Sequence, residues 1–301
     1  MKVMVFGGTG YLAGFVLDQL VADGHDVVAV RRSEADSVGR NATVNAATCR
    51  SAVEARKLIG DLVPDVVVNM ANYFSKVSTP EDIARFSAVN CELIAELSQG
   101  CVDSSSDLLH VGSAWQATFE ENDPSLGSPY ALFKGLAAQI IEWYKTWHDL
   151  RAYTLNLFDT YGPGDTRGKV VQFLTDNIGS SEPLELSEGH QILELVHVSD
   201  VATAVSGSLQ VIAKSRATGQ RPDVDEFWAY PTEANTLRQI VQTLDDLSGT
   251  PLTVNWGARQ YRVGEQFERV IEGRALVPGW TQRMSLRDGL NTVLSSSGSR
   301  T

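Results

Sequence analysis

The sequence predicts an α/β protein built on a doubly wound parallel sheet, with a smaller second lobe toward the C-terminus. Short apolar runs alternate with stretches of helical period over the first half of the chain, which is typical of parallel strands covered by helices on both faces. A glycine-rich turn follows the first apolar run, at residues 7–10. The regular alternation weakens after a turn cluster at residues 161–165, where substrate-binding elements can be inserted.

The individual elements follow from the apolar pattern in chain order. Runs of 4 to 8 mostly apolar residues suit buried parallel strands, and longer stretches with apolar residues on one face suit helices. The expected strands cover residues 3–6, 27–30, 65–70, 108–111 and 153–158. The expected helices cover residues 11–23, 52–62, 80–99 and 129–147.

The glycine-rich stretch 7–14 predicts a nucleotide-binding turn. Glycines let the backbone turn sharply and approach a pyrophosphate, whose charge is met by free N–H groups at the start of the next helix. Because the turn lies directly after a strand and before a helix, this interpretation is favoured over an ordinary strand–helix loop. The cofactor-binding residues expected here are Gly7, Thr9, Gly10, Tyr11 and Leu12.

The end of the second strand indicates which dinucleotide binds. Folds that bind NAD place Asp or Glu about 20 residues past the glycines, where it accepts hydrogen bonds from the ribose hydroxyls. Here the strand runs into Arg31, Arg32 and Ser33. An arginine offers a planar charged fork to the additional phosphate of NADP. We therefore predict NADP (NADPH) as the cofactor, with Arg31 as the main contact and Arg32 and Ser33 as helpers; a solvated basic pair is the alternative.

The composition narrows the class of protein. A chain of 301 residues with 43% hydrophobic content suits an α/β enzyme with a second lobe. A formal net charge of −12 argues against non-specific nucleic-acid binding, and no apolar run is long enough to cross a bilayer. Because Lys2 is followed directly by a strand, no signal peptide is expected and the protein is placed in the cytoplasm. The 3 cysteines and 5 histidines lack metal-ligand spacing, so no metal is expected.

Tyr130 and Lys134 lie four residues apart on an expected helix and so project from one face. An ammonium about 4 Å from a phenol stabilises the phenolate by on the order of 4 kcal/mol at an effective dielectric near 20, which lowers the pKa of the phenol toward neutrality. Such a phenol can donate a proton as a carbonyl becomes an alcohol. A solvated helix face is the default interpretation of this spacing alone.

Ser113 comes just after the strand at residues 108–111, at the edge where doubly wound sheets bind ligands. It can hydrogen-bond the reacting oxygen, although a serine considered alone more often caps a turn. Taken together with the glycine-rich turn and the Tyr130 and Lys134 pair, Ser113 favours a catalytic interpretation.

With these residues in place, the chain resembles the extended short-chain dehydrogenase/reductases that act on nucleotide sugars. The order of the matching segments carries the resemblance, which runs nearly end to end. These segments are VVVNMA at 66–71, Asn90, SA at 113–114, FEENDP at 119–124, SPY at 128–130, NLFDTYGPG at 156–164, ELVHVSDVA at 194–202, YRVGE at 261–265, GW at 279–280 and SLRDGL at 285–290.

The resemblance implies a Rossmann sheet with a smaller C-terminal α/β substrate lobe. The dinucleotide-binding domain would cover residues 1–165 with a return segment near 190–212, and the substrate-binding lobe would occupy mainly residues 166–294. Residues 295–301 have no apolar side chain and are expected to form a flexible tail. The family often pairs through a helix bundle, so a homodimer is expected.

The resemblance also implies roles for individual residues. Ser113 and Tyr130 contact the substrate oxygen, and Lys134 holds the nicotinamide ribose and Tyr130. Further cofactor contacts come from the backbone of Ala13 and from Met70, Ala71, Tyr130 and Lys134. The substrate-binding residues are Ser113, Asp159, Arg167 and Arg262, of which Arg262 holds the nucleotide diphosphate, with Lys169 as a weaker candidate.

Three positions depart from the family pattern. Ala13 replaces the usual third glycine, with Gly14 next to it. Asn156 and Asp159 stand where the family commonly has Arg and Asn. Asp159 is the more consequential of the two, because an acid near the nicotinamide or the sugar alters the local charge.

The family scaffold supports dehydration, epimerisation and ketone reduction, so the choice among these reactions must come from individual residues. Dehydratases of the family carry Thr-Asp-Glu where this chain has Ser113-Ala114-Trp115, which makes elimination an unfavourable assignment. Arg31 favours a reductase that takes up and releases NADPH. The expected reaction is NADPH-dependent reduction of a nucleotide-linked keto-deoxyhexose, at C4 of a 4-keto-6-deoxy sugar. The alternatives are an NAD-dependent nucleotide-sugar epimerase and a non-catalytic NADP-sensing regulator, which has no need of the catalytic residues.

Overall fold

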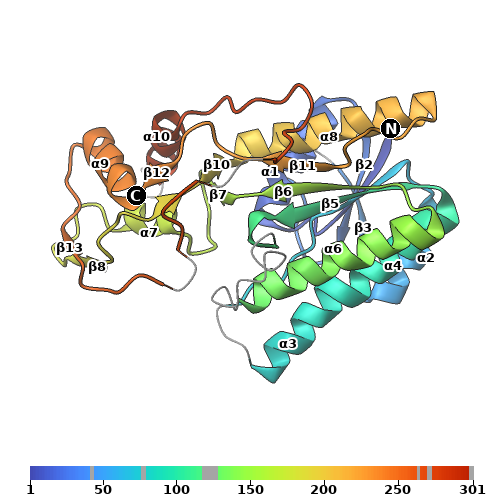
Figure 1. The fold of residues 1–301 in the computed structure, drawn as a ribbon, viewed down its shortest axis with the longest axis horizontal. Coiled ribbons are helices and arrows are strands. Elements are labelled where there is room, and N and C mark those ends of the chain that lie inside the picture. Colours follow the sequence, from blue (N-terminus) through green and yellow to red (C-terminus); the bar gives the residue numbers. More distant parts are fainter. Residues whose placement is uncertain (41–43, 76–78, 117–127, 263–264, 270–272, 298–301) are drawn as a thin grey trace. The chain divides into compact units, whose positions relative to one another are not determined.

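The computed structural model describes residues 1–40, 44–75, 79–116, 128–262, 265–269 and 273–297 (Figure 1). The chain divides into two compact units. The first unit comprises Met1–Leu157, Ala202–Trp228 and Ala275–Trp280. The second unit comprises Phe158–Val201, Ala229–Arg274 and Thr281–Thr301.

The first unit is built on a seven-stranded sheet in the order β11-β6-β5-β4-β1-β2-β3. Neighbouring strands from β6 to β3 pair in parallel, which confirms the predicted doubly wound parallel sheet. The strands are β1 (Lys2–Phe6), β2 (Asp26–Arg31), β3 (Asn45–Thr48), β4 (Val66–Asn69), β5 (Asp107–Ser113), β6 (Ala152–Leu157) and β11 (Glu226–Ala229). Edge strand β3 was not predicted, because its sequence NAAT has no apolar run to mark a buried strand.

Helices cover both faces of this sheet (Figure 1). The helices are α1 (Tyr11–Ala22), α2 (Ala52–Leu62), α3 (Pro80–Ser87), α4 (Leu93–Ser104), α6 (Pro129–His148) and α8 (Val198–Thr218). In Figure 1, α4 and α6 lie on one face and α8 on the other, and the Tyr153 hydroxyl of β6 meets Ser215 Oγ of α8 at 3.0 Å.

The helix expected over residues 80–99 is instead three consecutive pieces. Its start is fixed by a capping box between Thr79 and Asp82, with Pro80 in the first turn. A π-helical segment, η1 (Ala88–Glu92), then separates α3 from α4. The buried Asn90 in this segment donates its side-chain amide to the Phe86 carbonyl at 3.2 Å.

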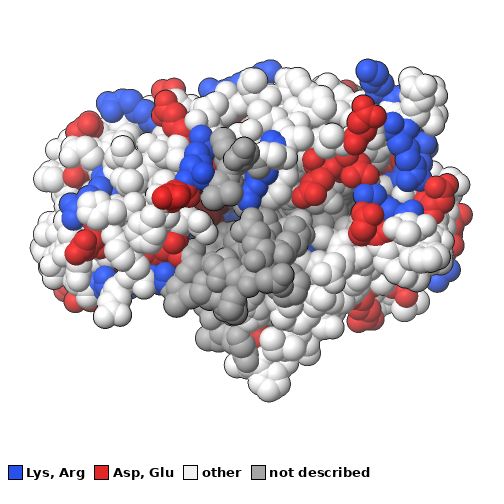
Figure 2. Space-filling view, in the orientation of Figure 1, with Lys and Arg blue, Asp and Glu red and all other residues white. Residues whose placement is uncertain are grey.

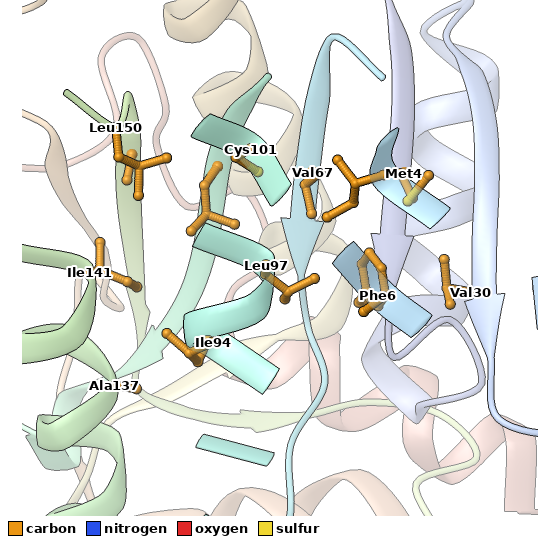
Figure 3. Packing of buried hydrophobic residues seen from close by; sticks show 14 of the residues in the cluster. Met4, Phe6, Val30, Val67, Ile94, Leu97, Cys101, Ala137, Ile141 and Leu150 are labelled. Atoms are coloured by element: carbon orange, nitrogen blue, oxygen red, sulfur yellow. The ribbon is translucent and has the colours of Figure 1, made fainter. Parts of the chain in front are cut away.

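The main hydrophobic core of the first unit lies between the sheet and helices α4 and α6. Figure 3 shows side chains from β1 and β4 near those of α4, with the side chains of α6 farther along, on the side of Leu150. Its buried members include Met4, Phe6, Val67, Ile94, Leu97, Cys101, Ala137 and Ile141. Burial of such side chains is the dominant favourable term in folding, at about 1.5 to 3 kcal/mol each.

In its described residues, the second unit contains three two-stranded sheets and three helices around its own core. The pairs β10 (Leu195–His197) with β7 (Asp159–Tyr161) and β13 (Val254–Trp256) with β8 (Leu184–Leu186) are parallel, and β12 (Asn235–Thr236) with β9 (Ile192–Leu193) is antiparallel. The helices are α7 (Val170–Asp176), α9 (Leu237–Ser248) and α10 (Leu286–Ser297). Helix α10 includes the first three residues of the stretch expected to be a tail, and the last four residues lie outside the described part of the chain.

Acidic and basic side chains are intermixed on the face shown in Figure 2. Among the described residues, no helix is both long and apolar enough to span a membrane. Within the same residues, no group of three or more His, Cys, Asp or Glu is placed to hold a metal ion.

A fully buried carboxylate joins three elements at the amino-terminal end of the sheet. Asp107 of β5 accepts from Arg151 Nε, just before β6, at 2.8 Å and from Arg216 Nη1 of α8 at 2.8 Å. The Asp107 side chain is 0% exposed, and the two arginine side chains are 29% and 30% exposed. The carboxylate therefore balances two half-buried positive charges.

We expect Asp107→Asn to lower the free energy of unfolding by about 2 to 3 kcal/mol, because it leaves two guanidinium groups with reduced compensation. Chemical denaturation measures this change. The matched control is Asp103→Asn, which breaks a 2.7 Å pair with Arg56 whose side chains are 42% and 47% exposed. That pair should contribute under about 1 kcal/mol. An equal loss of unfolding free energy in the two variants would contradict the larger contribution assigned to the buried Asp107 carboxylate.

Candidate active site

The glycine-rich turn between β1 and α1 lies against the segment that follows β4. Gly7 has φ +80°, in the left-handed region, and a Cβ there would lie 2.6 Å from the Ala71 nitrogen and 2.7 Å from the Met70 carbonyl carbon. Only glycine fits this close passage. The structure therefore brings together Gly7, Met70 and Ala71, three residues expected to contact the cofactor.

The first turn of α1 is arranged to accept an anion. Among the residues that the structure describes, no side chain caps this helix at Gly10, and its first turn holds no acidic residue. The helix dipole favours negative charge at this end. Thr9 is exposed, and Tyr11 and Leu12 are the first helical residues. Together with the close-packed Gly7, this geometry fits a dinucleotide pyrophosphate.

Arg31 is the last residue of β2, at the carboxyl edge of the sheet. Its Nη1 donates to the Asp36 carbonyl at 3.0 Å, while its Nε is buried with no hydrogen-bond partner among the described residues. A buried unpaired donor is costly, so this nitrogen is a candidate ligand contact. Arg32 and Ser33 are exposed next to it.

The loop after β2 brings in a third arginine that the sequence patterns did not reveal. The Arg40 guanidinium lies 3.8 Å from the centre of the Phe15 ring on α1. A Cβ on Gly14 would lie 2.6 Å from Arg40 Cγ, so Gly14 makes room for this side chain. The sequence offered one signal for this contact, the glycine next to Ala13. From the sequence alone, Gly14 is explained as a compensation for the missing third glycine, and only the structure shows that the loop after β2 crosses α1 at this point.

The three expected catalytic residues belong to β5 and α6. Ser113 is buried at the end of β5, and its Oγ accepts from the Trp115 N–H at 3.3 Å. Lys134 is 3% exposed, and its Nζ donates to the Val111 carbonyl at 3.0 Å. Tyr130 lies one turn earlier on α6. Lys134 is thus attached to β5 two residues before Ser113.

Burial lowers the pKa of Lys134 to about 8. The cause is desolvation, which disfavours the charged ammonium in the protein interior. A lysine with this pKa remains mostly protonated at neutral pH but carries its charge at a cost in stability.

The Tyr130 ring has an aromatic neighbour in the segment after β4. Phe74 packs edge-on against it, with ring centres 5.4 Å apart, and Phe74 is still 53% exposed. The preceding residue, Tyr73, donates its hydroxyl to Asp82 and packs against Phe86 at 5.0 Å. Phe74 is therefore held in place by its neighbour, and it adds an apolar surface beside Tyr130 that the sequence patterns did not indicate.

A layer of buried polar side chains lies on the α6 side of the sheet. Asn69 Nδ2 lies 3.1 Å from His110 Nδ1, and Asn69 Oδ1 accepts the Ala71 N–H at 3.1 Å. Asn156, one of the departures from the family pattern, donates to Glu226 Oε1 at 2.5 Å. Gly112 makes room for Asn156, because a Cβ there would lie 2.1 Å from its Oδ1.

The predicted substrate-binding residues Asp159, Arg167 and Arg262 belong to the second unit. Asp159 pairs with Lys169 at 2.8 Å. Arg167 contacts the buried Asp165 at 2.7 Å and the Thr160 carbonyl at 3.0 Å, so part of its hydrogen-bonding capacity is used within its own loop. Arg262 is exposed. Of the resemblance segments, residues 119–124 and 263–264 lie outside the described part of the chain.

The fold is that of an oxidoreductase/epimerase-type class of enzymes built on a parallel α/β sheet. A sequence model of the NAD dependent epimerase/dehydratase family matches residues 3–220, and the chain belongs to this family, within the extended short-chain dehydrogenase/reductases.

Individual relatives are more distant. The chain is 25% identical over 269 residues to a CDP-abequose synthase of Yersinia pseudotuberculosis, covering 88% of this chain and 90% of that protein. It is 22% identical over 301 residues to a CDP-abequose synthase of Salmonella typhimurium, covering 97% of each.

Solved structures share the fold. A UDP-glucose 4-epimerase from Thermotoga maritima with UDP-glucose matches with a TM-score of 0.80 at 19% identity, covering 99% of both chains. A UDP-glucuronic acid 4-epimerase from Bacillus cereus in complex with UDP-glucuronic acid and NAD matches with a TM-score of 0.79 at 18% identity, again covering 99% of both.

We expect the stability difference between the wild type and Lys134→Met to depend on pH. The folded pKa of Lys134, about 8, lies below its ordinary value of 10.5. The folded protein therefore binds fewer protons than the unfolded chain between these values, so the penalty of the buried charge is full below pH 8 and is relieved as the pH rises toward 10.5. The penalty amounts to about 3 kcal/mol.

Urea denaturation of both proteins from pH 7 to pH 10 measures this difference. The wild type should gain stability relative to Lys134→Met as the pH rises. The lost hydrogen bond to the Val111 carbonyl adds a pH-independent cost in the variant, which does not affect the slope. A difference that stays flat across this range would contradict a depressed pKa for Lys134.

Proposed function

We propose that the protein catalyses the NADPH-dependent reduction of a nucleotide-linked 4-keto-6-deoxyhexose to the corresponding alcohol, as a ketoreductase of deoxysugar biosynthesis. The observation that carries the proposal is the attachment of the buried Lys134 to the end of β5, two residues before Ser113, with Tyr130 one turn away on the same helix. This arrangement supports proton transfer to a carbonyl held at this edge of the sheet.

The proposed catalytic residues have distinct tasks. Tyr130 donates its phenolic proton to the carbonyl oxygen as the alcohol forms, and it accepts that proton in the reverse direction. The Ser113 hydroxyl donates a hydrogen bond to the same oxygen and orients it. Lys134 stabilises the phenolate through its charge and holds the nicotinamide ribose. NADPH, when bound, supplies the hydride.

Three further observations support the cofactor and the substrate class. Arg31, with its buried unpaired Nε, occupies the end of β2 where an acid would contact the ribose in an NAD enzyme. Both relatives described above are CDP-abequose synthases, a name that contains a nucleotide-linked sugar. The half-exposed Phe74 against Tyr130 offers an apolar surface that suits a deoxygenated sugar position.

A nucleotide-sugar epimerase is the second candidate, because solved epimerases share the fold over nearly the whole chain. An epimerase retains its dinucleotide through the reaction. Protein that carries NAD after purification and consumes no added NADPH in the presence of nucleotide keto-sugars would favour this candidate. A non-catalytic NADP sensor would bind the dinucleotide with no turnover of any sugar.

The homodimer and the cytoplasmic location are further proposals. Trp143 and Trp147 on α6 are 51% and 71% exposed, whereas Tyr144 packs against the core of the first unit. The two tryptophans are therefore candidates for a dimer surface, and Tyr144 belongs to the core.

We expect Tyr130→Phe to lower kcat by about 100-fold or more, because the proton donor is lost while the ring remains. A panel of nucleotide 4-keto-sugars with NADPH absorbance as the readout measures turnover. Binding of NADPH should stay within about twofold of the wild type. The matched control, Tyr144→Phe on the same helix, should keep full activity. Undiminished turnover by Tyr130→Phe would remove the phenol from the mechanism.

We expect Arg31→Asp to lower the preference for NADPH over NADH by about 10- to 100-fold, because a charge-assisted hydrogen bond to the 2′-phosphate contributes about 1.5 to 3 kcal/mol. The measured quantity is the ratio of kcat/KM for the two cofactors. Arg221→Asp makes the same charge change in an exposed arginine that pairs with Asp149, and it should leave the ratio unchanged. A wild type that prefers NADH would overturn the cofactor assignment.

A further inference from the structure

A buried histidine on β5 has no part in the proposed proton transfer. His110 is 1% exposed, and it is the register partner of Asn69 on β4. Its Nδ1 lies 3.1 Å from Asn69 Nδ2. Because Asn69 Oδ1 accepts the Ala71 N–H, the amide NH₂ group faces the imidazole and donates to Nδ1. The imidazole is thus neutral and carries its proton on Nε2.

The Asn69 side chain joins His110 to the glycine-rich turn. One end of the amide is held by the imidazole, and the other end holds the N–H of Ala71. The Ala71 nitrogen is also the atom that a Cβ on Gly7 would approach to 2.6 Å. A shift of Asn69 therefore moves the backbone that packs against Gly7, at the turn that fits the pyrophosphate.

The surroundings of His110 keep the ring in the form that accepts this hydrogen bond. Burial and the charge of Lys134 hold the pKa of His110 well below its usual range. Its Nε2 is buried without a hydrogen-bond partner among the described residues. Such an atom costs stability, which an apolar side chain at this position would avoid. A purely structural role in packing therefore gives no reason for a histidine here.

We propose that His110 is a positioning residue for the dinucleotide. It fixes the Asn69 amide, which in turn fixes the Ala71 backbone against Gly7. The inference rests on dinucleotide binding by the first unit, which is part of the proposed function. It does not depend on the sugar that is reduced.

The test compares two variants of the same shape in a binding assay without sugar. His110→Asn places an amide oxygen near the position of Nδ1, whereas His110→Leu has similar size and no acceptor. The dissociation constant of NADPH is measured by titration calorimetry, and the melting temperature of each protein is measured in parallel. We expect His110→Leu to raise the dissociation constant about tenfold, since a buried donor on Asn69 loses its partner. His110→Asn should stay within about threefold of the wild type.

A second comparison shows whether the effect passes through Asn69. Asn69→Leu alone should weaken NADPH binding by a similar factor, and adding His110→Leu to it should weaken binding no further. If His110→Leu does not fold, His110→Gln, whose amide lies nearer the Nε2 position, replaces it with the same expectation.

Three results would overturn the proposal. The first is a lower melting temperature of His110→Leu with unchanged NADPH affinity, which would make His110 a structural residue only. The second is additive weakening in the double variant. The third is a wild type that binds neither NADPH nor NADH, which would remove the dinucleotide site itself. A wild type that binds NADPH but reduces no keto-sugar would instead overturn the ketoreductase assignment and leave the His110 result standing.

Discussion

The hydrogen bond from the buried ammonium of Lys134 to the Val111 carbonyl organises the edge of the first unit that carries the proposed catalytic residues. A desolvated positive charge is retained in a protein interior only where it is paired or used. This bond fixes the first turns of α6 against the end of β5, and so it determines where the phenol of Tyr130 and the hydroxyl of Ser113 are presented. Lysine has three donors, and one of them is bound to protein in the described part of the chain. In the proposed function, the other two would meet the ribose hydroxyls of the dinucleotide.

The same edge depends on two positions that lack a side chain. Gly7 admits the backbone of Met70 and Ala71, and Gly112 admits the amide of Asn156. In both places the room left by a missing Cβ is filled by a polar group of a neighbouring strand or its following loop. The close packing of these segments makes the turn after β1 and the ends of β4, β5 and β6 one connected layer, because a shift in one of them would create a clash or an unpaired polar atom in the next.

The sequence predicted most of the sheet, because strands and helices of this kind depend on local patterns, and the proposed catalytic pair on α6 rests on a local pattern too. Apolar runs mark the buried strands, and the spacing of Tyr130 and Lys134 is a property of one helix. Strand β3 was not predicted, because its four residues form no apolar run. The short paired strands of the second unit were not predicted either, because they form through contacts between segments distant in sequence. The pairing of Asn69 with His110 depends on the register between β4 and β5. No pattern within either strand contains that register, so His110 could only be read as a buried histidine.

The π-helical turn between α3 and α4 determines how the two helices are rotated relative to each other about their axes. An α-helix advances about 100° per residue, so the wider turn at η1 shifts the angular relation between α3 and α4. Leu97, in α4, faces the hydrophobic core, while Phe86, in α3, stacks on Phe133 at 5.4 Å and supports Tyr73. Deleting one residue from this π-helical turn would rotate α3 about its axis relative to α4. Phe86 and Tyr73 would shift with α3 and carry Phe74 away from the phenol of Tyr130, although every proposed catalytic side chain would still be present.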